Sequence, residues 1–135
     1  MTREWGGRVQ VRRGDAVDVL AHPGLVAIDG GPVGMLTYAL DPATGEGEIL
    51  WLASTLERRA GVGTALLVAL PPARRWVVTT TNDNVDALRF YQRRGFRLLE
   101  VRIGAVDDAR ATLKPTIPLV GNHGIDLHDE IELWR

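Results

Sequence analysis

The chain of 135 residues contains no cysteine, and this absence excludes several chemistries. Disulfide bonds, thiolate metal sites and a cysteine nucleophile all need a residue that the sequence lacks. No apolar run reaches the roughly 20 residues that a membrane-spanning helix requires, and the first residues lack the apolar core of a signal peptide. The sequence therefore predicts a cytoplasmic protein that does not associate with membranes.

An excess of charge of one sign is also missing, since 16 basic residues face 17 acidic residues and the net charge is −1. Nucleic-acid binding usually needs a clear basic excess, so this balance argues against it. The hydrophobic content of 45% is ordinary for a soluble globular protein. Without internal repeats, low-complexity runs or linkers, residues 1–135 are predicted to form a single domain.

The first half of the chain predicts three strands joined by short turns rich in Gly and Pro, which is typical of an antiparallel meander. The expected strands are residues 25–28, 33–40 and 48–53. The preceding residues 1–23 are harder to assign. Residues 8–13 alternate as a short edge strand would, and residues 15–21 are compatible with one or two helical turns.

The second half predicts alternating helices and strands. An apolar helix follows Gly63 and stops at Pro71 and Pro72, because proline cannot continue a helix. The next strand, 76–81, is expected to run parallel to strand 48–53 through a right-handed crossover. The remaining expected elements are a helix at 85–93 closed by Gly95, a strand at 96–101, a short helix at 105–113, a loop at 115–127 and a strand at 129–134.

The stretch Glu57–Thr64 joins a strand to a helix through a glycine-rich turn. Gly61 and Gly63 allow the backbone to approach a ligand closely, and the free amides of a first helical turn favour an anion. Arg58 and Arg59 add positive charge beside those amides. The stretch lacks the Gly-Lys-Ser/Thr ending of a P-loop and the third glycine of a dinucleotide fingerprint, so it predicts a phosphate site other than one for ATP or NAD.

A second motif follows the strand at 76–81. On a helical projection, Asn84, Ala87, Leu88 and Tyr91 fall on one face of the predicted helix. With Gly95 and Phe96 they match the pattern Asn-x-x-Ala-x-x-x-Tyr-x-x-x-Gly-Phe. Residues 58–63 match Arg/Gln-x-x-Gly-x-Gly/Ala. In this order, separated by a strand, the two motifs resemble those of the GNAT superfamily of acyl-CoA-dependent N-acyltransferases, over roughly residues 24–135.

The resemblance implies a mixed α/β fold, with a mostly antiparallel twisted sheet, a splayed central parallel strand pair and helices on both faces. It implies acetyl-CoA as cosubstrate and no metal. The pyrophosphate of CoA is expected on backbone amides of Arg58, Arg59, Ala60, Gly61, Val62, Gly63 and Thr64. The thioester carbonyl is expected at an amide of Leu52 or Ala53, and Asn84 and Ala87 are expected to face the pantetheine.

The catalytic roles that the resemblance implies fall on two residues. The Tyr91 hydroxyl would protonate the departing thiolate of CoA, and Glu48 would take a proton from the attacking amine, with Glu46 or a water chain as the alternative base. The expected activity is transfer of an acetyl group to a primary amine by direct attack in a ternary complex. The alternatives are a non-catalytic CoA-binding or sensing module, and an acyltransferase for longer chains.

Some features depart from the family pattern or stay open. Arg59 and Ala60 stand where a glycine is common, and the short N-terminal segment leaves the acceptor site incompletely walled, which is compatible with a homodimer. The acceptor is expected to be a small-molecule or peptide amine of unspecified identity. His123, Asp126, His128 and Asp129 are potential metal ligands, but they lie in a loop without helical His spacing, and no metal site is expected.

Overall fold

The computed structural model describes residues 9–55 and 61–135, without the side chains of Val9 and Val11. These residues form two compact units, one that holds Val19–Trp76 and one that holds the N-terminal residues up to Asp18 together with Val77–Arg135. The fold is mixed α/β with mostly antiparallel strands, as predicted. The predicted parallel pair joins strands of different units and stays a prediction, as does the single domain.

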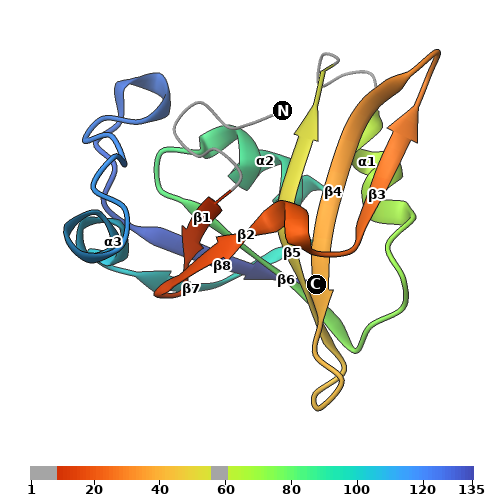
Figure 1. The fold of residues 1–135 in the computed structure, drawn as a ribbon, viewed down its shortest axis with the longest axis horizontal. Coiled ribbons are helices and arrows are strands. Elements are labelled where there is room, and N and C mark those ends of the chain that lie inside the picture. The colour runs from red at the N-terminus through yellow and green to blue at the C-terminus, as the bar shows by residue number, and fades with distance from the viewer. Residues whose placement is uncertain (1–8, 56–60) are drawn as a thin grey trace. The chain divides into compact units, whose positions relative to one another are not determined.

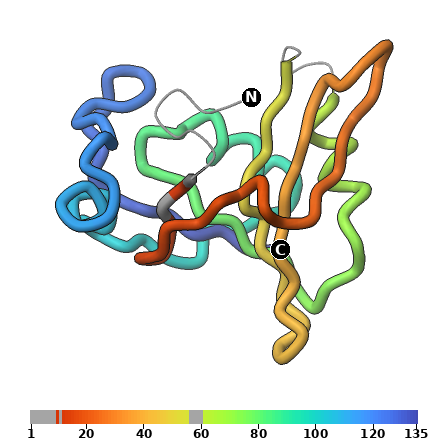
Figure 2. The backbone as a smooth tube through the Cα atoms, viewed as in Figure 1, coloured from red at the N-terminus to blue at the C-terminus, as the bar shows by residue number. Residues whose placement is uncertain are grey.

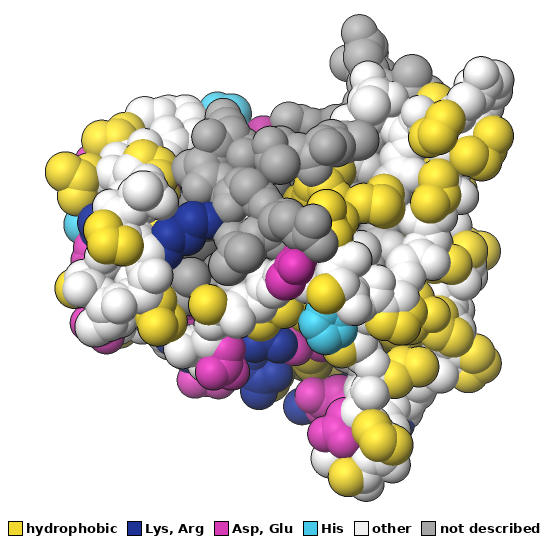
Figure 3. All heavy atoms as spheres, viewed as in Figure 1, with side chains coloured by type: hydrophobic (Ala, Val, Ile, Leu, Met, Phe, Trp, Pro, Cys, Tyr) yellow, Lys and Arg dark blue, Asp and Glu magenta, His cyan; other side chains and the backbone are white. Residues whose placement is uncertain are grey.

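The unit Val19–Trp76 is built on an antiparallel meander, which confirms the predicted order of strands (Figure 1). Its strands are β3 (Gly24–Ile28), β4 (Pro32–Leu40) and β5 (Glu46–Ser54). A three-residue turn (29–31) and a five-residue turn (41–45) join them, and the hairpin between β4 and β5 extends as a long arm (Figure 2). On β3, Val26 and Ile28 are 54% and 67% exposed, and hydrophobic side chains gather over this strand in Figure 3.

The pairing of β4 with β5 contains a bulge. Thr37 faces Trp51, but the next residue, Tyr38, faces Ile49, so Leu50 has no partner on β4. Because cross-strand partners lie on the same face of a sheet, the extra residue puts Glu48 on the face of Trp51 and opposite Leu52. The bulge therefore changes which β5 side chains share a face.

Helix α1 (Val62–Val68) packs against this meander because Gly34 leaves room for it. A Cβ atom on Gly34 would overlap Cγ1 of Val62 and would lie 3.4 Å from Cδ1 of Leu66. Val62, Leu66 and Leu67 are all buried. At the other end of β4, the ring of Trp76 lies over Gly47 and packs edge-on against Tyr38 at 5.7 Å. The core of this unit is thus set by two glycines that face bulky side chains.

In the other unit, β8 (Glu130–Trp134) pairs antiparallel with both β6 (Arg75–Thr81) and β7 (Arg97–Arg102). Helix α2 (Val85–Arg93) has the predicted bounds. Gly95 follows it with φ 91°, the left-handed conformation expected of a helix-terminating glycine. Helix α3 (Ala105–Thr112) also forms where the sequence predicts it. None of the helices in the described ranges is long and apolar enough to cross a membrane.

One N-terminal prediction is wrong. Residues Asp15–Asp18 are strand β2, paired with β1 (Val9–Arg12), and only Val19–Ala21 forms a short 3-10 turn in place of the expected helical turns. The hairpin turns at Arg13 and Gly14, whose φ angles are 53° and 80°. Arg13 is one of the few non-glycine residues in this conformation, and its backbone N–H donates to Oε1 of Glu130 at 3.1 Å. A contact with a residue far away in the sequence therefore supports a turn that the local sequence does not predict.

The segment between α3 and β8 is held to the end of β6 by two side chains, the buried Asp83 and the half-buried Asn82. Asp83 is fully buried; it accepts from the Thr81 hydroxyl and, at 2.8 Å, from the backbone N–H of Asn122. Asn82 accepts through Oδ1 from the backbone N–H groups of His128 and Asp129 at 3.0 and 2.9 Å. Of the three polar residues before α2, it is the next one, Asn84, that caps the helix.

Arg110 of α3 also holds the segment between α3 and β8 in place, through hydrogen bonds to its backbone. Its guanidinium donates to the backbone carbonyls of Ile117, Pro118 and Leu127 at 2.8–3.0 Å. Ile117 and Leu127 are buried together with Val106 and Ala109 of α3 in a small hydrophobic cluster. Figure 2 shows the chain winding back beside α3 at this place. The segment at 115–127 is thus an ordered loop, as predicted.

Candidate functional site

The glycine turn before α1 has the backbone geometry of an anion site. Gly61 is the N-cap, with φ 76°, and among the described residues no atom outside its neighbours lies within 4 Å of a Cβ built on it. The first intrahelical bond runs from the N–H of Ala65 to the carbonyl of Gly61, so the amides of Val62 and Gly63 have no acceptor within the helix. The helix begins at Val62, before its predicted start after Gly63. Arg58, Arg59 and Ala60 lie outside the described residues.

The backbone amides of Leu52 and Ala53 differ in whether they donate a hydrogen bond to β4. The N–H of Thr55 donates to the carbonyl of Val33 at 2.9 Å, which makes this a hydrogen-bonded pair of the β4–β5 ladder. In an antiparallel ladder such pairs alternate, and in this register the next one joins Ala53 to Met35. The amide of Leu52 is therefore turned away from β4. Of the two backbone amides predicted to donate to the thioester carbonyl, only that of Leu52 is not used in the pairing with β4.

Glu48 and Glu46, the two candidate bases, differ in their surroundings. Glu46 accepts from Nε of Arg75 at 2.6 Å, and this ion pair occupies its carboxylate. Glu48 is half-buried opposite Ala39. On its face of the meander, the buried atoms Oγ1 of Thr37 and Nε1 of Trp51 have no hydrogen-bond partner within the described ranges. Buried polar atoms usually have hydrogen-bond partners. This face therefore carries polar groups whose hydrogen bonds the described residues do not satisfy.

In the other unit, Asn84 and Ala87 form the N-terminal cap of α2. Oδ1 of Asn84 accepts from the backbone N–H of Ala87 at 3.1 Å. The cap uses the side-chain carbonyl of Asn84 and leaves its amide group to contact a ligand. Both residues thus have a structural role at the helix start, in addition to the role in pantetheine binding that the motif predicts.

Tyr91 lies on the buried face of α2, as the helical projection predicts, and is 5% exposed. Its ring packs edge-on against Phe90 at 5.1 Å and against Phe96 at 5.2 Å. Its backbone carbonyl accepts from the N–H groups of Arg94 and Phe96, which turns the chain from α2 into β7. The motif residues around Tyr91 therefore fix the position and orientation of its ring.

The sequence profile of the acetyltransferase (GNAT) family matches residues 9–96, which include both motifs. The chain belongs to this family. Two relatives from Bacillus subtilis (strain 168) are similar to this GNAT protein: the uncharacterized protein YxbD, 38% identical over 87% of this chain and 76% of the relative, and the uncharacterized protein YdhI, 42% identical over 73% of this chain and 63% of the relative. The chain thus spans less than two thirds of YdhI.

Solved structures share the GNAT fold. The chain is 25% identical to an IAA acetyltransferase from Bacillus cereus, with a TM-score of 0.67 over 82% of this chain and 75% of the other. A Bacillus subtilis acetyltransferase in complex with CoA is 19% identical, with a TM-score of 0.65 over 82% of this chain and 74% of the other. A GNAT acetyltransferase from Elizabethkingia anophelis with acetyl-CoA bound has a TM-score of 0.65, with 23% identity over 80% and 71% of the two chains. Family and fold together support an acyltransferase activity.

Two of the potential metal ligands before β8, His123 and His128, are paired with aspartates. Nδ1 of His128 lies 3.0 Å from Asp107, whose carboxylate also accepts from Arg110 at 2.9 Å, and His123 lies 3.1 Å from Asp86. The hydrogen bond to Asp107 raises the pKa of His128, and the bonds from His128 and Arg110 lower the pKa of Asp107. In the described part of the chain no three His, Asp or Glu side chains are grouped to hold a metal ion.

The His128–Asp107 pair predicts a pH-dependent stability. Because the pKa of His128 is raised in the folded protein, its contribution is complete below the unfolded pKa of about 6.5 and is lost as the pH rises through the folded value. Because the pKa of Asp107 is lowered, its contribution is complete above about pH 4 and is lost on further acidification. We expect the His128→Gln variant to be less stable than the parent between about pH 4.5 and 6.5, by a margin that shrinks above this range.

Urea unfolding of both proteins across this pH range measures the effect. The exposed His22 supplies the control, since His22→Gln removes an imidazole from the other unit. A constant stability difference between His128→Gln and the parent at all pH values would contradict the prediction.

Proposed function

We propose that this GNAT protein transfers an acetyl group from acetyl-CoA to a primary amine. The observation that carries the proposal is the left-handed Gly61 at the start of α1, which leaves the amides of Val62 and Gly63 without helical acceptors. Such amides, at the positive end of a helix, suit a pyrophosphate. Thr64 and the arginines at positions 58 and 59 would add further contacts with this group.

The proposed reaction has four roles for residues of this chain. The amine nitrogen attacks the thioester carbonyl carbon, and the amide of Leu52, turned away from β4, donates to the oxygen on which charge develops. Glu48 takes a proton from the amine. When the carbon–sulfur bond breaks, the Tyr91 hydroxyl protonates the departing thiolate, and a phenol with a pKa near 10 is close enough to a thiol near 8.5 for this transfer. The amide of Asn84 would orient the pantetheine.

The proposal also covers the class of acceptor and the location of the protein in the cell. The acceptor is a small-molecule or peptide amine, and residues 1–135 are taken to function as one cytoplasmic acetyltransferase domain. The polar face that Glu48 shares with Thr37 and Trp51 favours an amine that carries further hydrogen-bonding groups over a purely apolar one.

A thermal-shift titration with acetyl-CoA, CoA, ATP and NAD tests the cosubstrate. A ligand at about 100 times its dissociation constant adds roughly 2.7 kcal/mol of stability, which raises the unfolding midpoint by several degrees. We expect this shift with the CoA species alone. The shift should be lost in Gly61→Asp and largely kept in Gly61→Asn, because both side chains tolerate positive φ but only aspartate repels the pyrophosphate. Equal binding by both variants would place the phosphate site elsewhere.

Tyr91→Phe should retain acetyl-CoA affinity and lower kcat by about 10²-fold or more, because the ring keeps its packing and the reaction loses its acid. Steady-state rates over a panel of amines, with a thiol reagent to detect released CoA, measure this change. Unchanged turnover would remove Tyr91 from the mechanism. CoA binding without turnover on any amine by the parent would favour a sensing module, and faster turnover with longer acyl-CoA would favour the longer-chain alternative.

Glu48→Gln and Glu46→Gln form a matched pair for the base. Glu46 is held by Arg75, so we expect Glu46→Gln to change kcat less than about threefold, whereas Glu48→Gln should lower it by about 10²-fold near neutral pH. The loss in Glu48→Gln should diminish at high pH, where the amine is already deprotonated. If Glu46→Gln is the slower variant, the assignment of the base is reversed.

A further inference from the structure

Two buried polar atoms on the meander of β3, β4 and β5 have no hydrogen-bond partner among the residues that the structure describes. They are Oγ1 of Thr37 on β4, a residue that is 2% exposed, and Nε1 of Trp51 on β5, a residue that is 3% exposed. The two residues are directly opposite each other in the β4–β5 pairing, so their side chains lie on the same face. Two neighbouring hydrogen bonds are therefore left for another molecule to make.

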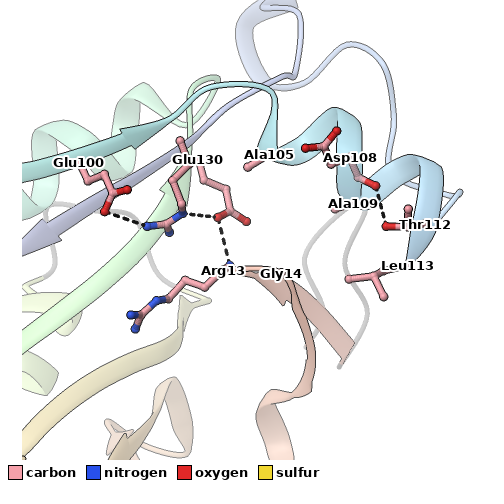
Figure 4. A pocket seen from close by; sticks show the side chains of 10 residues that line it. Arg13, Gly14, Glu100, Ala105, Asp108, Ala109, Thr112, Leu113 and Glu130 are labelled. Atoms are coloured by element: carbon pink, nitrogen blue, oxygen red, sulfur yellow. Dashed lines mark hydrogen bonds and ion pairs between the residues drawn. The ribbon is translucent and has the colours of Figure 1, made fainter.

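Buried polar groups of the other unit are paired within the chain. Glu130 is 3% exposed and accepts from Nε of Arg102 at 2.9 Å and from the backbone N–H of Arg13 at 3.1 Å. Glu132 accepts from the same guanidinium at 2.8 Å. Figure 4 shows Glu130 held in this way at the pocket beside α3. Because these side chains find partners inside the protein, they indicate no ligand, in contrast to the pair on the meander.

The face that carries Thr37 is turned away from α1. Gly34 lies on the opposite face of β4, where it meets the side chain of Val62. The short turn Val19–Ala21 also contacts β4, and Figure 1 shows this turn in front of the meander and α1 behind it. Glu48, the candidate base, shares the face of Thr37 because of the bulge in β5. The unpartnered atoms thus lie on the face where acetyl transfer would need the acceptor amine.

The two side chains limit the kind of group that can bind to them. An indole N–H only donates, whereas a hydroxyl donates or accepts, so a group that satisfies both must present an acceptor oxygen. The strands β3, β4 and β5 and the turn Val19–Ala21 contain no lysine or arginine. A carboxylate here would be buried without a counter-ion, on the same face as Glu48. The oxygen is therefore expected to be uncharged, as in a hydroxyl or an amide carbonyl.

The position of Glu48 limits the length of the ligand. Glu48 pairs with Ala39, which is the next residue after Thr37 on the same face of β4. Two residues of a strand span about 7 Å, so an amine at Glu48 reaches Thr37 and Trp51 with an oxygen about three carbon atoms away from its nitrogen. The ligand is thus a small amine with a nearby polar group.

We propose that the acceptor is an amine with an uncharged oxygen about three carbon atoms from its nitrogen, and that Thr37 and Trp51 donate hydrogen bonds to this oxygen. This inference rests on the proposed acetyl transfer and narrows its acceptor to amino alcohols and amino amides. An alkylamine leaves both buried groups unpaired, and an amino acid brings an uncompensated negative charge. A site built to bind an oxygen rejects a substrate that lacks it.

The indole N–H signal of Trp51 reports on this site without any turnover. The four tryptophans give four such signals in a proton–nitrogen spectrum of the full chain, and the signal that Trp51→Phe lacks belongs to Trp51. The probes are 3-amino-1-propanol and β-alaninamide, titrated with and without CoA. Their matched controls are n-butylamine, which lacks the oxygen, and β-alanine, which carries a carboxylate.

We expect the two probes to move the Trp51 signal saturably to higher frequency, as a new hydrogen bond to the indole does, and the two controls to leave it in place. A Trp51 signal that none of the four compounds moves would overturn the proposal. So would a shift of equal size with n-butylamine, because that amine has no oxygen to accept from Trp51.

Steady-state acetylation of the same amines measures the selectivity. In the parent, kcat/KM for 3-amino-1-propanol should exceed that for n-butylamine at least tenfold. Thr37→Val should abolish this preference, and Thr37→Ser, which restores the hydroxyl, should recover it. A parent without the preference, or an equal loss of it in both variants, would overturn the proposal.

The two experiments separate this inference from acetyl transfer itself. A saturable shift of the Trp51 signal without release of CoA would support the oxygen site and contradict acetyl transfer. Release of CoA with all four amines at similar kcat/KM would support acetyl transfer and overturn the oxygen site.

Discussion

The buried carboxylate of Asp83 is the constraint on which the unit formed by β6, β7, β8 and the helices α2 and α3 depends. It accepts hydrogen bonds from the Thr81 hydroxyl at the end of β6 and from the backbone N–H of Asn122 in the distant loop. Gly121 lies so close that any Cβ there would overlap the carboxylate. Such a carboxylate is tolerated in the interior only while its donors are in place. One side chain thereby fixes the exit of β6, the start of α2 and the loop that leads into β8.

The arrangement around Asp83 explains why the chain can carry a long loop without losing order. Asn82 holds the residues just before β8, and Arg110 holds the loop from α3 through three backbone carbonyls. Each anchor satisfies backbone groups that a loop would otherwise leave to water. The carboxylates of β8 are brought against Arg102 and the β1–β2 turn by the same anchors.

The sequence predicted those features whose causes are local. Glycine turns, hydrophobic alternation and the capping pattern around Asn84 and Gly95 act over a few residues, and they located α2 and the strands to within about two residues. It did not predict β2, because Asp15–Asp18 are strand residues only through their pairing with β1 and the support of Glu130 at the turn. Nor did it predict the Glu130–Arg102 network, whose members lie 28 residues apart. Both acidic residues of this network, Glu130 and Glu132, are buried beside the guanidinium of Arg102.

The bulge at Leu50 determines which substitutions along β5 fall on the same surface of the sheet. In a regular strand, residues separated by an odd number of positions point to opposite sides, yet Glu48 and Trp51 share a side here. The two ends of β5 are therefore out of phase: even-numbered positions before the bulge and odd-numbered positions after it form one surface. Substitutions confined to one surface of β5 would follow this break in the alternation, and a one-residue deletion at Leu50 would exchange the surfaces of half the strand.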